Sequence, residues 1–127
     1  MTSRQTEAPY WDITRKVIGA AFEVHKTLGP GFLEKVYVNS LVTELAEARI
    51  KTAVEVGIPV QYKGYEVGQY YADIVVEENV ICEIKAVAAI SPAHEAQLLN
   101  YLKATGVKVG LLLNFGSKSV EVKRMVL

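Results

Sequence analysis

The segment 80–115 constrains the fold more than any other part of the chain, because it reads as a strand, a helix and a second strand in succession. Its two apolar runs, 80–86 and 108–115, have the length of buried strands. Between them, Ser91 and Pro92 are typical of a helix start, with serine at the N-cap and proline at the first helical position. A crossover of this kind is nearly always right-handed and leaves its two strands parallel. We therefore expect an α/β fold in which helices pack against a mixed sheet.

The regions around this unit add helices before it and strands on both sides. Apolar residues recur at three- and four-residue steps early in the chain, with Asp12 or Thr14 expected to cap the first helix, and they alternate with other residues from Val54 onwards. Lys63-Gly64 marks a turn between strands, and a break in the second strand is expected at Gly68. The predicted elements are helices over 12–28, 32–48 and 92–104, and strands over 54–62, 65–76, 80–86, 108–115 and 119–126.

Length and composition fit one soluble domain. The chain has 127 residues, half of them hydrophobic and 22% charged, so we expect a single domain over 1–127, with 1–11 as a loose N-terminal segment. No apolar stretch reaches the roughly 20 residues that a membrane span needs. The single cysteine excludes an internal disulfide and a thiolate zinc cage, and it favours a reducing cytoplasm.

The charge balance bears on the partners of the chain. Fourteen basic residues offset fourteen acidic ones, whereas a free-standing nucleic-acid binder usually carries a basic excess. Zero net charge therefore counts against strong autonomous DNA binding. Zero net charge remains compatible with a local basic patch, a bound metal, a homo-oligomer or a protein partner that delivers the substrate.

Two carboxylates and a lysine are brought together by the hairpin expected over 71–85. Folding this stretch about Glu78 places Asp73 opposite Glu83, and Lys85 points to the same face because it lies two residues further on. Facing carboxylates destabilise a sheet, which predicts a cation between them. Carboxylate oxygens suit Mg²⁺, with Mn²⁺ as an alternative. Such a metal polarises a phosphate and activates water, and a lysine stabilises phosphoryl charge.

A purely structural interpretation of these charges is the alternative. Glu83 and Lys85 can form an ion pair on a solvent-facing strand, since structural charge clusters imitate functional sites. The same Glu-x-Lys spacing recurs at Glu121 and Lys123, where no aspartate stands in a matching hairpin register. Glu-x-Lys by itself is therefore a weak signal.

The helix over 92–104 carries a polar stripe. Gln97 and Tyr101 are four residues apart and share a face, with His94 one turn earlier and leucines opposite. This stripe is placed to overlook the end of the preceding strand, although a solvated helix face is the plainer interpretation. Structural roles are expected for His94 at the helix start, for His25 bonded to backbone, and for Cys82 in the core.

Three runs of residues resemble one family. Gly31-x-x-Glu34-x-x-Tyr37 is similar to the signature of the GxxExxY protein family, a branch of the PD-(D/E)XK nuclease superfamily. The resemblance extends to the run 23–31 before it and to the run 94–101 after it. On the residues alone, Tyr37 lies on the apolar stripe of its helix and is expected to pack rather than react.

The resemblance implies an αβββαβ core like that of restriction endonucleases, with an extra N-terminal helix. It also implies a role for six residues. Asp73 and Glu83 would be the metal ligands, Lys85 the catalytic lysine, Glu34 the supporting acid of the first core helix, and Gln97 and Tyr101 the Gln-x-x-x-Tyr pair.

Three functions are open on this basis. The first is a magnesium-dependent nuclease that acts on nucleic acid, DNA rather than RNA, with no membrane partner. The second is a non-catalytic module that binds nucleic acid or protein on the same fold. The third is a hydrolase that uses Glu34 and Glu83 as an acid–base pair, which would leave Asp73 and Lys85 without a role.

Overall fold

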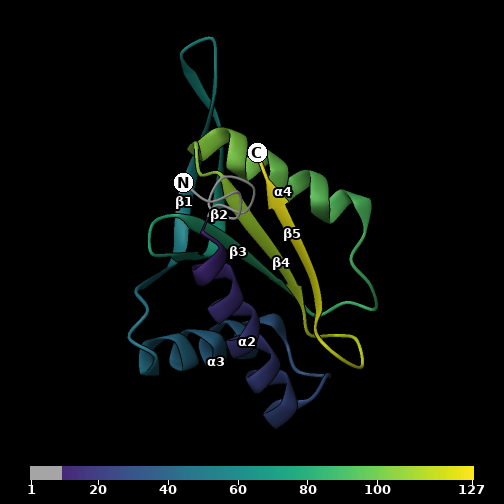
Figure 1. Ribbon diagram of the computed structural model, residues 1–127. Coiled ribbons are helices and arrows are strands. Elements are labelled where there is room, and N and C mark those ends of the chain that lie inside the picture. Colours follow the sequence, from purple (N-terminus) through teal and green to yellow (C-terminus); the bar gives the residue numbers. More distant parts are fainter. Residues whose placement is uncertain (1–9) are drawn as a thin grey trace.

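A five-stranded mixed sheet lies between helices in the computed structural model, which describes residues 10–127 (Figure 1). The elements are α2 (Trp11–Leu28), α3 (Glu34–Glu47), β1 (Thr52–Tyr62), β2 (Tyr65–Val76), β3 (Val80–Lys85), α4 (Pro92–Thr105), β4 (Val109–Asn114) and β5 (Glu121–Val126). The strands lie side by side in chain order, and β3 and β4 are parallel while the other neighbours are antiparallel. The expected mixed sheet and its parallel crossover are therefore confirmed.

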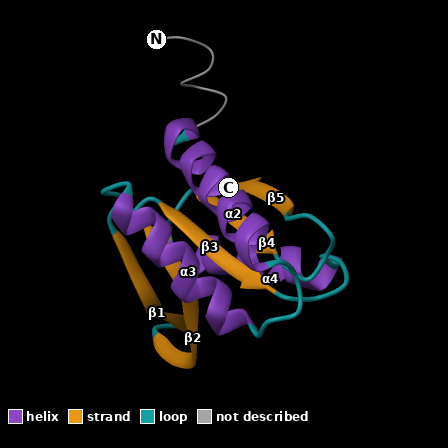
Figure 2. Ribbon diagram, turned by 90° about the horizontal axis from the view of Figure 1, so that it is seen from below, coloured by secondary structure: helices purple, strands orange, loops and turns teal. Residues whose placement is uncertain are grey.

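Helices cover both faces of the sheet and divide the core in two. α2 and α3 pack on one face, where their apolar stripes meet Ile74, Cys82 and Ile84 (Figure 2). α4 packs on the other face, against Ile81 and Leu112. Because β3 and β4 are covered on both sides, their residues are nearly all buried, as expected for parallel strands in an α/β sheet.

The start of α4 follows its sequence signal closely. Ser91 Oγ accepts a hydrogen bond from the His94 N–H, and the Ser91 N–H donates to His94 Nδ1, at 3.3 and 3.0 Å. This reciprocal pair is a capping box in which histidine takes the usual place of glutamate. The structural role expected for His94 is confirmed, and Gly106 ends the helix in the left-handed region at φ 76°.

The first two helices begin differently from the expectation. Neither Asp12 nor Thr14 caps α2: Tyr10 occupies the N-cap without a side-chain bond, and the Thr14 hydroxyl donates instead to the Trp11 carbonyl. α3 begins at Glu34 rather than Phe32, because Leu33 is still extended with ψ 157°. Of the segment 1–11 expected to be loose, residues 1–9 lie outside the described residues.

The hairpin of β1 and β2 projects beyond the rest of the sheet (Figure 1). β2 is a continuous strand through Gly68, and the irregularity lies beside it, where the register shifts between Val60 and Gln61. Gln61 pairs with Glu66 and Val60 with Gly68, so β2 holds one extra residue. No helix within residues 10–127 is long and apolar enough to cross a bilayer.

Candidate metal-binding active site

The site begins where the hydrogen-bond ladder between β2 and β3 stops. The last ladder pair is Ile74 with Cys82, and the next pair in the same register is Asp73 with Glu83. The hairpin register expected about Glu78 is thus confirmed. Beyond the ladder the carboxylates act as acceptors: the Asp73 N–H donates to Glu83 Oε2 at 2.7 Å, and the Ile84 N–H donates to Asp73 Oδ2 at 2.8 Å.

Burial and mutual repulsion disfavour the charges of both groups. The Glu83 side chain is 4% exposed, and this burial, reinforced by the negative charge of Asp73, raises the pKa of Glu83 to about 8. Burial likewise raises the pKa of Asp73, against the opposing effects of the Ile84 N–H and Lys85. A cation shared by the two groups would remove this penalty. The buried position of Glu83 also rules out the solvent-facing strand of the structural interpretation.

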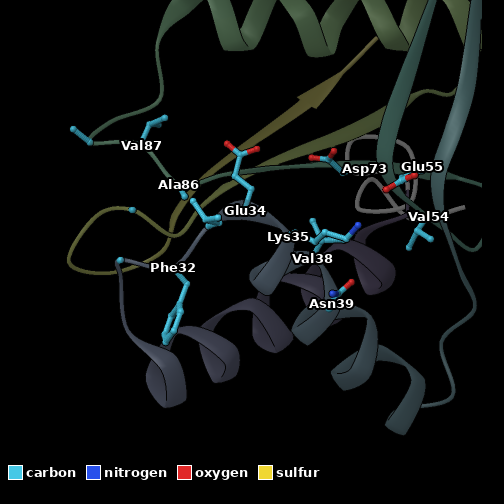
Figure 3. Close-up of a pocket in the computed structure, with 14 residues that line it drawn as sticks. Phe32, Glu34, Lys35, Val38, Asn39, Val54, Glu55, Asp73, Ala86 and Val87 are labelled. Atoms are coloured by element: carbon cyan, nitrogen blue, oxygen red, sulfur yellow. The ribbon is translucent and has the colours of Figure 1, made fainter.

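Glu34 reaches the same cleft as Asp73, although the two residues belong to different elements, α3 and β2. It stands in the first turn of α3 and lines a surface cleft with Asp73 and Glu55. Figure 3 shows Glu34 and Asp73 among the residues that line this cleft, with Glu55 beside Asp73. The charges of Glu34 and Glu55 both act to raise the pKa of Asp73. The predicted approach of Glu34 to Asp73 is therefore found.

Glu55 is a site residue that the sequence interpretation missed. In β1 it lies between Val54, which pairs with Ile74, and Val56, which pairs with Ala72, so it stands opposite Asp73. Its φ of 50° is in the left-handed region, which costs a non-glycine residue about 1–3 kcal/mol and is found disproportionately at functional sites. Only its charge and its place in an alternating strand could have pointed to it.

The side chains of β2 change from one face of the sheet to the other at Asp73. Residues two apart on a regular strand share a face, yet Ala72 packs in the core under α4 and Ile74 in the core under α2 and α3. The outer part of the hairpin is thereby directed toward α4, and the inner part toward α3. Asp73 lies at the change of face, which accounts for its exposure to the cleft while its neighbours Ala72 and Ile74 are fully buried.

Lys85 ends β3 beside Asn114 of β4 and is half-buried. In the described part of the chain, no ion pair within 4.0 Å joins its ammonium to a carboxylate. Its positive charge still lowers the pKa of Asp73 and of Glu83. The alternative in which Glu83 and Lys85 form a direct ion pair is thus not observed.

α4 brings Tyr101 to the carboxylates from the opposite face. Tyr101 is 7% exposed and packs with Leu98 and Leu102, so it is not on a solvated stripe. Its burial, with the charges of Glu83 and Asp73, raises the pKa of its hydroxyl. Gln97 and Tyr101 line a groove between α4 and the β1–β2 hairpin, separate from the cleft of Glu34. The six predicted residues therefore surround the strand pair from two sides instead of lining one pocket.

Tyr37 explains the spacing of the Gly-x-x-Glu-x-x-Tyr motif. Its hydroxyl donates to the Gly29 carbonyl at 2.6 Å and accepts from the Phe32 N–H at 3.1 Å. Its ring is fully buried and stacks on Phe115, with centroids 4.6 Å apart. Tyr37 thus ties the loop before α3 to the end of β4 and holds Glu34 at the cleft. It packs rather than reacts, as expected.

A second network holds the opposite wall of the cleft, formed by the loop after Lys85. The buried Asn114 side chain accepts from the Val87 N–H at 3.0 Å and donates to the Val87 carbonyl at 2.9 Å. Glu121 accepts from Asn114 and from the Ile90 N–H. The second Glu-x-Lys pair is therefore structural: Glu121 anchors this loop, and Lys123 pairs with Glu95 at 3.4 Å. The structural roles of His25, bonded to the Ser117 carbonyl, and of buried Cys82 are also as expected.

Comparison with known proteins agrees with this geometry. A family model described as the PD-(D/E)XK nuclease superfamily matches residues 11–125. The chain belongs to the PD-(D/E)XK nuclease superfamily. The structure of this chain is similar to the crystal structure of SSO0001, with a TM-score of 0.52 and 16% sequence identity. That similarity covers 98% of this chain but 59% of SSO0001, and it concerns the fold alone. No curated protein matches the sequence significantly.

Proposed function

We propose that this protein is a magnesium-dependent nuclease that hydrolyses phosphodiester bonds of nucleic acid, DNA in preference to RNA. The observation that carries the proposal is the pairing of Asp73 and Glu83 beyond the end of the ladder, where each accepts a backbone N–H from the other's strand. A buried pair of carboxylates is costly unless a cation or a proton neutralises it.

The donor set fits magnesium better than a metal that requires a protein cage. Among residues 10–127, no three side chains of His, Cys, Asp or Glu are grouped to hold an ion together. Mg²⁺ characteristically keeps several waters and takes one or two carboxylates from the protein, which Asp73 and Glu83 would provide; Mn²⁺ would be accepted in the same way. When bound, such an ion supplies Lewis-acid polarisation and a more acidic water.

The remaining residues would act on the substrate itself. Lys85, within electrostatic range of both carboxylates, would stabilise negative charge on the phosphoryl oxygens. Glu34 would add negative charge at the mouth of the cleft, which favours a cation there. Tyr101 would approach from the α4 side, and Gln97 would line the approach beside it. We further propose that the chain is a member of the GxxExxY branch, supported by the structural role of Tyr37 in placing Glu34.

A non-catalytic module on the same fold is the second candidate. Zero net charge favours it, because unaided binding of a polyanion draws on basic residues. The same balance is compatible with a homo-oligomer or a protein partner that supplies the grip on nucleic acid. Such a module would have no need of Lys85 in its present position.

A cleavage assay with matched lysine variants separates the two candidates. Single-stranded and duplex DNA and RNA would be incubated with the parent, Lys85→Ala and Lys123→Ala, in magnesium and in chelator. We expect magnesium-dependent cleavage by the parent and by Lys123→Ala, and a loss of roughly a hundredfold or more in Lys85→Ala. Lys123 is the control because it has the same Glu-x-Lys spacing but only a surface ion pair. Equal cleavage by both variants, or none by the parent on any substrate, would refute the nuclease assignment.

A further inference from the structure

The groove between α4 and the β1–β2 hairpin has a chemistry unlike that of the acidic cleft. Its volume is about 820 Å³, within the range of pockets that hold small organic ligands. Six of the residues that line it carry aromatic, amide or ammonium groups: Gln61, Tyr70, Gln97, Asn100, Tyr101 and Lys103. Among the described residues that line the groove, none is acidic, whereas the cleft on the other side contains Glu34, Glu55 and Asp73.

An exposed aromatic ring forms one wall of this groove. Tyr70 is 49% exposed even though it lies over α4, and its ring centroid is 5.9 Å from that of Tyr101 at a tilt of 48°. The ring therefore offers exposed surface to a ligand while it stays in contact with Tyr101. Aromatic faces of this kind stack on nucleobases without regard to sequence, and amide side chains bond the edges of bases.

The groove leads to the proposed site through Tyr101. This residue lines the groove and belongs to the same buried cluster as Ala72, which precedes Asp73, and Leu112, which pairs with Glu83. A strand whose phosphate lies at the carboxylates would thus have an adjoining nucleotide in the groove. Lys103 stands on the wall of the groove that α4 contributes and can neutralise one phosphate.

We propose that this groove binds an unpaired nucleotide of a single-stranded nucleic acid, with the base against Tyr70 and a phosphate beside Lys103. A base within a duplex is stacked on both faces and cannot offer one to Tyr70, which is why the ligand is a single strand. The proposal rests on the proposed function for the nucleic-acid nature of the ligand. It concerns binding, however, and it is tested where no cleavage occurs.

Binding of a labelled oligothymidylate of about 12 nucleotides, a length within the usual range of single-strand sites, would be followed by fluorescence anisotropy in chelator. We expect Tyr70→Ala to weaken binding about tenfold, the scale of one base–aromatic contact, and Tyr70→Phe to bind like the parent. Tyr65→Ala is the matched control, because Tyr65 lies on the same hairpin and is 75% exposed but does not line the groove. Lys103→Ala should weaken binding and reduce the salt dependence by about 0.7 in slope.

Three results would overturn the proposal: equal losses in Tyr65→Ala and Tyr70→Ala, no loss in Tyr70→Ala, or a duplex of the same length bound as tightly as the single strand. Photocrosslinking of the unmodified protein to a strand containing 5-iodouracil avoids any effect of substitution on folding. Crosslinks at Tyr70 or Tyr101 support the groove, and crosslinks confined to Tyr65 contradict it. Tyr70-dependent binding without cleavage under any condition would refute the nuclease assignment alone, and cleavage without Tyr70-dependent binding would refute the groove alone.

Discussion

Asp73 and Glu83 each accept a backbone N–H from the strand that carries the other, so that two carboxylates replace the ladder where β2 and β3 separate. This arrangement has opposite consequences with and without a cation. With a cation, the N–H donors and the ion together satisfy both groups. Without one, burial and mutual repulsion favour protonation. Metal binding, pH and stability should therefore be linked in this protein.

Replacing Asp73 with Asn should separate stability from metal binding. The amide oxygen can still accept the Ile84 N–H, while the repulsion with Glu83 disappears. In chelator, we expect Asp73→Asn to be at least as stable as the parent in thermal melts. At a magnesium concentration 100 times the dissociation constant, the parent should gain about 2.7 kcal/mol, and the variant should gain little. A parent that ignores millimolar magnesium, together with a destabilised variant, would contradict the metal site.

The stability of the metal-free protein should fall as the pH rises, whereas a carboxyl group with a lowered pKa makes stability rise with pH. The pKa of Glu83 rises from 4.5 to about 8 on folding, so between these values the folded state binds more protons than the unfolded chain. The stabilisation from the protonated group is fully present below pH 4.5 and is lost as the pH rises toward about 8. Denaturant titrations in chelator should show this fall, and Glu83→Gln should lack it. A parent whose stability is unchanged over the same window would show that folding does not raise the pKa of Glu83.

Removing the hydroxyl of Tyr37 should loosen the loop before α3. Tyr37→Phe retains the ring stack on Phe115 but loses the bonds to Gly29 and Phe32, at a cost of about 1–3 kcal/mol for the two together. We expect lower stability in urea and weaker magnesium binding, since Glu34 follows this loop. Tyr65→Phe, on an exposed tyrosine, is the control and should change neither. A loss of stability with unchanged magnesium affinity would make Tyr37 a packing residue only.

Gly116 should not tolerate a side chain. A Cβ at this position would lie 2.3 Å from the Val87 carbonyl oxygen, in the loop that forms a wall of the cleft. Gly116→Ala must displace this loop and should cost about 1–3 kcal/mol, as overpacking does. Gly19→Ala is the matched control: it lies in α2 with nothing within 4 Å of the added atom, so it should stabilise the helix by up to about 1 kcal/mol. Equal melting temperatures for the two variants would contradict the close approach.

Much of the fold followed from local patterns. The alternation of residues placed Cys82 and Ile84 in one core and Glu83 on the other face, and the short turn about Glu78 set the register that pairs Asp73 with Glu83. The helix start at Ser91 was equally local, because a capping box involves neighbouring residues only. The cap expected at Asp12 or Thr14 was wrong, because Tyr10 occupies the N-cap of α2, and α3 begins two residues after Phe32 because Leu33 is still extended.

By itself, the sequence determined the periods of the elements, the parallel crossover and the opposition of Asp73 to Glu83, since each depends on side-chain spacing along one or two adjoining elements. Tertiary structure decided the rest of the site. The extra residue opposite Val60 and Gln61 shifts the β1–β2 register by one, and this shift puts Glu55 opposite Asp73. Packing of α3 and α4 on opposite faces brings Glu34 and Tyr101 to the carboxylates from two sides. These placements depend on how separate elements pack together. The spacing of residues along the chain does not specify how far apart in space two such elements lie.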